Sequence, residues 1–294
     1  MIRPAVLDRL LWRIPTDLPP HAQTRTVETH GSRLRVRDTG AGKPGVVFIC
    51  DPPNTVEHYD DLIAELGGNY RLLILELPGF GFSRADDLDA VTFAGSVAAV
   101  ESALAALAPG PVVLCGPCVG GFVAAAVARR GRIPVAGLVL MQTPDTEGMR
   151  AWTARMDARG HLRRPWLGQL LTRLTAKRLT ALWYRYAVGR DTDPRPLADT
   201  ALAVLERGGA YPLATMFQLW SRDMTDQPVA CPTLAIWGEQ DRSHKYTDRE
   251  SSRRHAPDAT LCRFENCGHF PDLENPARFA ATVRPFLDTH LGKF

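Results

Sequence analysis

The sequence lacks any apolar stretch long enough to cross a membrane, and it lacks an export signal. Hydrophobic residues make up 45% of its 294 positions, yet no run approaches the roughly 18 residues of a spanning helix. The first 15 residues include Asp8, Arg9 and Arg13, so they have no uninterrupted apolar core of the kind a secretory signal needs. We interpret them as a short amphipathic helix within an N-terminal extension, residues 1–23, of a protein without a membrane partner.

Charge and cysteine content exclude further classes. A net charge of only +3 gives no reason to expect a nucleic-acid partner. The sequence has only four lysines against 31 arginines, and none of the four lies in a motif. The arginine bias is typical of a high-GC bacterial genome, where a role in natural-product biosynthesis is plausible. The six cysteines have no zinc-site spacing. With no export signal, they predict a reduced, cytoplasmic protein without metal or other cofactor.

Short apolar runs alternate with helical stretches along the chain. The predicted strands are residues 25–29, 33–38, 46–50, 70–75, 111–115, 135–141, 233–237 and 260–264. The predicted helices are residues 57–66, 92–107, 120–130 and 276–291. Such runs fit strands buried on both faces, so the alternation predicts an α/β fold with a mostly parallel central sheet flanked by helices. Residues 144–227 contain no strand candidate and predict a helical cap, inserted between core segments 24–143 and 228–294.

The string LCGPCVGGF, residues 114–122, follows a predicted strand and begins a predicted helix. It has the G-x-S-x-G spacing of a nucleophile elbow, with Cys118 in the serine position. The turn would present Cys118 beside the N–H of Val119 and the positive end of the helix, and both should lower the pKa of the thiol. C-G-P-C also matches a thioredoxin-type redox pair. Cys115 falls inside the predicted strand, however, and thioredoxin-like domains are much shorter, so the nucleophile is favoured.

Three further strings make the chain resemble the α/β-hydrolase-fold superfamily. They are YRLLILELPGFGFS at 70–83, CPTLAIWGEQDR at 231–242 and NCGHFPDLENP at 266–276, which resemble the fourth strand and its loop, the acid-bearing strand and the histidine loop. The resemblance spans residues 24–294 and is weakest at 144–227. It implies a capped member with Cys118, Asp241 and His269 as nucleophile, acid and base, in the order this fold requires. His269 would take the thiol proton and Asp241 would orient the imidazole; Asp145, after another strand, is the alternative acid.

The segment after the third strand departs from the family's usual His-Gly-x-Pro. It reads CDPPN, residues 50–54, so the expected backbone donor of the oxyanion hole falls on Pro52, which has no N–H. Val119 is then the aligned donor, and losing its companion typically costs about 2.7–4 kcal/mol of transition-state stabilisation. Asn54, His58 or a side chain of the cap could replace it, or a shifted loop could present another N–H.

Two other side chains of this segment are predicted to lie near the site. Asp51 stands in the glycine position of the family string and Cys50 in the histidine position. Cys50 is explained either by packing, which we favour, or as a second thiol close to Cys118.

The predicted cap is aromatic and basic. We predict that a few side chains contact substrate, namely His58, Trp152, Trp166, Trp183 and Tyr184. Between positions 150 and 190 the sequence has ten Lys or Arg and one acid, Asp157, which is a charge of +9 by count. Either this is the solvated face of an amphipathic cap, or it attracts an anionic partner such as an acyl carrier protein, a coenzyme A thioester or a carboxylate.

Acyl chemistry is the leading functional hypothesis: a thioesterase or esterase whose Cys-His-Asp triad cleaves or transfers the acyl group of a small-molecule ester or thioester. The second is a lyase on the same scaffold, in which His269 removes a proton and a carboxylate such as acetate is eliminated. Acetate-eliminating members of this fold act in tetronate polyketide pathways, and elimination would explain the altered segment at 50–54. The third is a non-catalytic binding protein, which would have no need of an intact acid and histidine.

Overall fold

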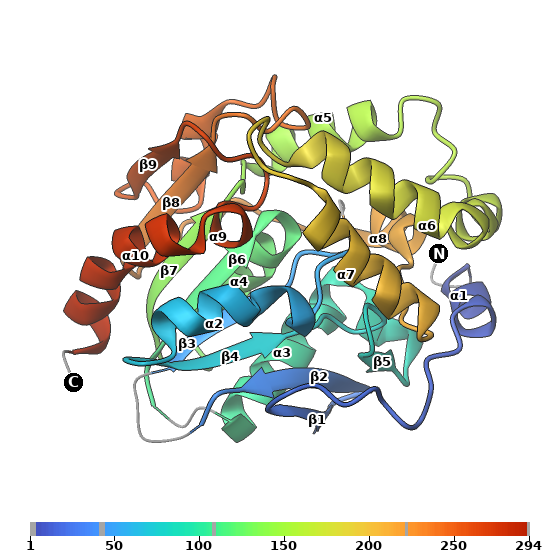
Figure 1. Ribbon diagram of the computed structural model, residues 1–294, viewed down its shortest axis with the longest axis horizontal. Helices are drawn as coiled ribbons and strands as arrows, with labels where there is room; N and C mark the ends of the chain where they lie inside the picture. The colour runs from blue at the N-terminus through green and yellow to red at the C-terminus, as the bar shows by residue number, and fades with distance from the viewer. Residues whose placement is uncertain (1–3, 41–44, 108–109, 221–222, 293–294) are drawn as a thin grey trace.

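The computed structural model describes residues 4–40, 45–107, 110–220 and 223–292. Within them, nine strands form one sheet in the order β1-β2-β4-β3-β6-β7-β8-β9, with β5 paired to β2 (Figure 1). Their bounds are Thr24–Thr29 (β1), Ser32–Asp38 (β2), Gly45–Ile49 (β3), Arg71–Leu75 (β4), Arg84–Ala85 (β5), Val112–Pro117 (β6), Val135–Met141 (β7), Thr233–Gly238 (β8) and Thr260–Phe264 (β9). The pairs of β2 with β1, β4 and β5 are antiparallel, and the others are parallel.

The predicted mostly parallel sheet is therefore confirmed. Alternate side chains of its central strands enter two separate apolar clusters, because successive residues of a strand point to opposite faces. In β3, for example, Val47 and Ile49 belong to one cluster, and Val46 and Phe48 to the other. Strands buried on both faces read as continuous apolar runs, which explains why the sequence located them.

Helices cover both faces of the sheet. Helices α3 (Phe93–Leu107) and α4 (Cys118–Arg130) bury their apolar side chains in the first cluster, and α2 (Asp60–Leu66) and α10 (Pro276–Leu291) bury theirs in the second. The helix predicted at 57–66 is instead a 3₁₀ turn, Val56–Tyr59, followed by α2. The helix predicted at 120–130 begins two residues earlier, at Cys118. Shorter elements that the sequence did not indicate are Leu88–Val91 and Arg249–Arg254, both 3₁₀, and α9 (Pro271–Glu274).

The segment predicted as a cap is helical. Its helices are α5 (Thr146–Met156), α6 (Leu167–Ala187), α7 (Arg195–Glu206) and α8 (Leu213–Leu219), and its described residues include no strand; residues 221–222 lie outside the described part. In Figure 1 these helices gather over one end of the sheet. The predicted N-terminal helix is α1 (Ala5–Leu11), which packs against α6; residues 1–3 lie outside the description. Across the described residues, every helix is too short or too polar to cross a bilayer.

Candidate active site

Cys118 lies at a sharp turn between β6 and α4. Its φ is +46°, in the left-handed region that non-glycine residues rarely adopt and that is often retained at functional sites. Glycine is required on both sides of it. A Cβ on Gly116 would lie 2.4 Å from the backbone of Gly120, and a Cβ on Gly120 would lie 2.5 Å from the carbonyl oxygen of Ile49. The spacing recognised in the sequence therefore corresponds to a backbone that larger residues could not follow.

His269 and Asp241 face each other beside this turn. Nδ1 of His269 lies 2.6 Å from Oδ2 of Asp241. The other oxygen of Asp241 accepts hydrogen bonds from the backbone and hydroxyl of Ser243, and Oδ2 accepts a second from the Gln142 amide. Burial alone would raise the pKa of Asp241, but the charge and hydrogen bond of His269 lower it below its usual range. Asp241 is therefore an anion held by several donors.

Asp51 occupies the opposite side of His269. It follows β3, and its Oδ2 lies 3.3 Å from Nε2 of His269. Burial raises the pKa of Asp51, although the hydrogen bond and charge of His269 and the nearby N–H of Val119 oppose the rise. Burial works against a charge on His269, but Asp241 and Asp51 outweigh it and raise its pKa well above the usual range. With a carboxylate at each ring nitrogen, the imidazolium form of His269 is favoured, and this form can donate from both nitrogens.

The sulfur of Cys118 and a ring nitrogen of His269 lie within 4.8 Å of each other, but the thiol is not poised as a thiolate. Burial, followed by the nearby charge of Asp51, raises its pKa to about 11. The predicted lowering of this pKa is therefore wrong, since desolvation and a neighbouring carboxylate outweigh the helix terminus. Cys115 is a free thiol in the apolar cluster on the other face of the sheet, so it forms no redox pair with Cys118.

His244 is a site residue that the sequence analysis missed. Its ring stacks on that of His269, with centroids 5.4 Å apart, and on that of Trp152, at 5.5 Å. Burial lowers its pKa to about 3, so it is neutral. The signal available was its place three residues after Asp241. Cys118, His244 and His269 each offer one donor atom within 4.8 Å of the others, the only such cluster among the described residues. Both ring nitrogens of His269 already face carboxylates, so this cluster as it stands does not fit a metal ion.

A cavity of about 320 Å³ opens above Cys118. Its wall is mostly apolar and combines the sheet edge with the helical segment, through Asp51, Pro52, Cys118, Val119, Trp152, Met156, Leu162, Leu179, Leu182, Trp183, Tyr186, Tyr211, Leu213, Met216 and Phe217. The predicted Trp152 and Trp183 are among them. No described lysine or arginine lines this cavity, and Asp51 is its charged side chain. The cations of residues 150–190 lie elsewhere, for example in the pairs Arg163–Asp157 and Lys177–Glu206.

Three residues predicted to contact substrate lie outside the cavity wall. His58 and Tyr184 are buried together: Nε2 of His58 lies 3.1 Å from both the Tyr184 hydroxyl and the Leu197 carbonyl oxygen, and Tyr184 donates to Asn54 at 2.7 Å. Trp166 is half exposed at the start of α6. His58 and Tyr184 therefore tie the core to the helical segment instead of lining the cavity, and Asn54 is used in the same network instead of replacing an oxyanion donor.

Asp145 and Cys50, for each of which the sequence left two explanations open, both have structural roles. Asp145 caps α5 by accepting from the N–H of Gly148 and pairs with Arg254, so it is not the partner of His269. Cys50 is buried in the second apolar cluster, which also contains Val46 and Phe48, and it does not line the cavity. Burial raises the pKa of its thiol well above the usual value, so packing explains it.

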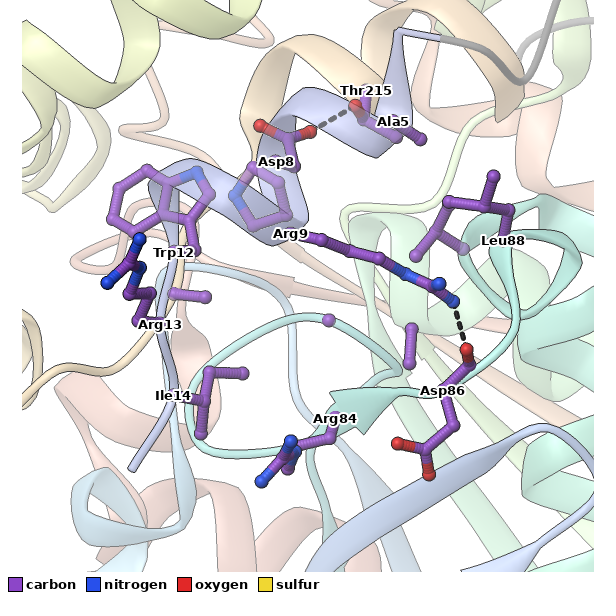
Figure 2. A pocket seen from close by; sticks show the side chains of 15 residues that line it. Ala5, Asp8, Arg9, Trp12, Arg13, Ile14, Arg84, Asp86, Leu88 and Thr215 are labelled. Carbon is purple, nitrogen blue, oxygen red and sulfur yellow. Dashed lines mark hydrogen bonds between the residues drawn. The ribbon is translucent and has the colours of Figure 1, made fainter. Parts of the chain in front are cut away.

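A second cavity, of about 370 Å³, lies beside α1 and shares no lining residue with the first. Figure 2 shows Asp8 directed at Thr215 and Arg9 directed at the carbonyl oxygen of Asp86. None of the predicted site residues lines it. Burial raises the pKa of Asp8 to about 6, although the hydrogen bond from Thr215 opposes the rise.

Asp8 should make the stability of the protein depend on pH. Between about pH 4 and pH 6 the folded state keeps a proton that the unfolded state releases, so stability should fall as pH rises through this window. Asp8→Asn should therefore have a higher free energy of unfolding than the wild type at pH 7, by about 2 kcal/mol, and no advantage at pH 4. Urea unfolding at both pH values measures this. The exposed Asp17→Asn is the control, and an advantage independent of pH would contradict the explanation.

The fold and this site define the class of protein to which the chain belongs. A doubly covered, mostly parallel sheet carries a side chain with nucleophilic chemistry at a strand-to-helix turn, with a histidine and a carboxylate at neighbouring strand ends. The Alpha/beta hydrolase family model matches residues 40–282, and the chain belongs to this family.

Relatives within the family carry different activities. A protein of Nitrosomonas europaea named pimeloyl-[acyl-carrier protein] methyl ester esterase is 28% identical over 265 residues, covering 84% of this chain and 97% of the relative. A protein of Yersinia pestis named 2-succinyl-6-hydroxy-2,4-cyclohexadiene-1-carboxylate synthase is 29% identical over 238 residues, covering 76% of this chain and 80% of that one.

Solved structures share the fold at lower identity. An epoxide hydrolase from an endophytic Streptomyces superposes with a TM-score of 0.75 at 18% identity, covering 91% of this chain and 96% of that chain. A thermophilic esterase from Thermogutta terrifontis superposes with a TM-score of 0.66 at 22% identity, covering 92% of this chain and all of that one. The protein is thus an α/β-hydrolase enzyme.

Proposed function

We propose that this protein cleaves or transfers the acyl group of an ester or thioester, with Cys118 as nucleophile, His269 as proton carrier and Asp241 as its anionic partner. The observation that carries the proposal is one chain of contacts. The sulfur at the strained turn lies within 4.8 Å of a ring nitrogen of His269, whose Nδ1 lies 2.6 Å from Asp241. A nucleophile, a base and an orienting carboxylate in contact are the requirements of covalent acyl transfer.

The reaction follows from these contacts. The proton of the Cys118 thiol passes to His269 while the sulfur attacks the acyl carbon, and the carbonyl electrons move to the oxygen beside the N–H of Val119. The tetrahedral species collapses, and His269 gives a proton to the departing alcohol or thiol. The acyl group remains on Cys118 as a thioester. Water or a second acceptor then attacks this thioester, losing its proton to His269, while Asp241 balances the charge on the imidazole throughout.

The cavity supports an apolar acyl group as substrate. Its volume of about 320 Å³ lies in the usual range of small-molecule sites, and its wall has no described cation to pair with a carboxylate. If the acyl group is carried by coenzyme A or an acyl carrier protein, that anionic part would contact the basic surface of residues 150–190 instead. The esterase named above, whose name gives an acyl-carrier-protein ester, makes such a carrier a reasonable partner. The helical segment would act as the cap that excludes water.

Carboxylate elimination is the second candidate, favoured by one observation. Pro52 has no N–H to donate, and the N–H of Val119 lies near the carboxyl of Asp51, so the site offers little free stabilisation to an acyl oxyanion. Elimination of acetate from an acidified carbon needs no tetrahedral intermediate. There His269 would remove the proton, and Cys118 would form no bond.

Trapping the acyl-enzyme separates the two. We expect p-nitrophenyl hexanoate, mixed with the protein and quenched in acid within seconds, to leave one hexanoyl group on Cys118, found by intact-mass and peptide mass spectrometry. The adduct should disappear at the rate of product release, and Cys118→Ala should give none. The solvent-accessible Cys231 serves as control, and Cys231→Ala should still be acylated. Turnover of the same ester without an adduct would contradict the covalent mechanism.

A further inference from the structure

The contacts of His269 leave the Cys118 thiol without a group that can accept its proton. Both ring nitrogens of His269 face carboxylates, Asp241 at 2.6 Å and Asp51 at 3.3 Å. An imidazolium has no lone pair with which to accept a proton from Cys118. The thiol therefore cannot be activated by His269 alone, and the second oxyanion donor is missing at Pro52.

A single residue can both accept a proton from His269 and replace the missing oxyanion donor. We infer that Asp51 is a catalytic residue, an inference that rests on the function proposed above. Asp51 takes the Nε2 proton of His269 while that nitrogen takes the thiol proton. The new O–H of Asp51 then donates a hydrogen bond to the acyl oxygen. A carboxyl would thus stand where relatives use a backbone N–H.

The proton movements balance. At rest the site holds a neutral thiol, an imidazolium and two carboxylates. The Nε2 proton moves to Oδ2 of Asp51, and the freed lone pair accepts the proton of Sγ. The result is a thiolate, an imidazolium, the Asp241 carboxylate and a neutral Asp51 acid, with the total charge unchanged. The thiolate then attacks the acyl carbon. When the tetrahedral species collapses, the leaving group takes the Nε2 proton of His269, and Asp51 returns its proton to Nε2.

The position of Asp51 fits this role. Its side chain is buried yet lines the cavity, so it faces both His269 and substrate. It lies near the N–H of Val119, the donor proposed for the acyl oxygen, and once protonated it competes less for that N–H because a neutral carboxyl is the weaker acceptor. Burial favours its neutral form, as its raised pKa indicates. Tyr211 is the other hydroxyl-bearing wall residue close to this charge, since Asp51 and Cys118 contribute to raising the pKa of its phenol.

The first test is chemical and needs no substrate. Asp51→Asn keeps the shape but removes the charge that raises the pKa of Cys118. Alkylation of Cys118 by iodoacetamide at pH 7 should then be faster than in the wild type, by about tenfold for a fall of one pKa unit. The site would gain a thiolate, which a mutation that only disturbs packing would not produce. An equal or slower alkylation rate would overturn the shared proton.

The second test is turnover of p-nitrophenyl hexanoate. Asp51→Ala removes the donor and should lower kcat by about 10² to 10³, and Asp51→Asn, whose amide still donates, should fall between Ala and wild type. If kcat fell by less than threefold in Asp51→Ala, or fell further in Tyr211→Phe than in Asp51→Ala, the role of Asp51 as donor would be overturned.

Asp272→Asn is the matched control. Burial also raises the pKa of this carboxyl, to about 7, but Asp272 does not line the cavity. Its alkylation rate and its turnover should therefore equal those of the wild type. If Cys118 proved not to be the nucleophile, turnover would persist in Cys118→Ala, whereas the alkylation result would still report on Asp51.

Discussion

Turnover should fall by about 10⁴ to 10⁶ when Cys118 is replaced by alanine, because the bond-forming atom is removed and the remaining groups act as a unit with it. Cys118→Ser should keep a measurable rate, since this fold normally uses serine at the elbow. Steady-state hydrolysis of p-nitrophenyl hexanoate, with single-turnover acylation in parallel, measures both. Alanine and serine differ from cysteine at a single side-chain atom, so the unfolding midpoints should remain close to that of the wild type.

The informative comparison is between the two variants. If Cys118→Ala retained turnover within about tenfold of Cys118→Ser, the covalent role would be untenable and elimination through His269 would take its place. Val119→Ala, which keeps the backbone donor beside the same turn, controls for damage to the elbow.

Removing the imidazole or its partner should be almost as costly. His269→Ala should lower kcat by about 10⁶ and Asp241→Asn by about 10⁴. The double variant should be no worse than His269→Ala, because the carboxylate acts only through the imidazole. Losses that multiply would contradict a shared role.

Asp241 also has a structural function, so turnover must be scored per folded molecule. Its carboxylate accepts from Ser243 and Gln142 as well as from His269. Unpaired donors left in Asp241→Asn should lower the free energy of unfolding by about 1–3 kcal/mol. Ser243→Ala removes one of these bonds but leaves the carboxylate on His269. It should lose stability while keeping most of the turnover, which separates the two effects.

The elbow could be predicted from the sequence because its requirements are local. Gly116 is needed because a Cβ there would meet the backbone of Gly120, whereas Gly120 is needed because of the carbonyl oxygen of Ile49. Both glycines stand at a fixed spacing from Cys118, so the turn leaves a readable string. Asp241 and His269 could be predicted for a related reason. Each follows an apolar run that reads as a strand, and the carboxyl ends of parallel strands meet at one edge of the sheet.

The charge state of the site depended on tertiary structure. Asp51 and His269 are 218 residues apart in the chain, and the 3.3 Å contact between their side chains exists only in the folded protein. The sequence indicated a helix terminus that lowers the pKa of Cys118. Burial and the carboxylate of Asp51 raise it instead, because desolvation depends on every atom packed around the thiol.

The cavity wall is a second property of the tertiary structure. The aromatic residues of the helical segment look alike in the sequence, yet Trp152 and Trp183 face the cavity, whereas Trp166 is half exposed and Tyr184 is buried against Asn54. Their orientation follows from how α5, α6 and α8 pack on the core. The sequence by itself determined the sheet, the turn and the positions of Cys118, Asp241 and His269 at the ends of strands. Packing between distant segments decided which further residues meet them, and in which protonation state.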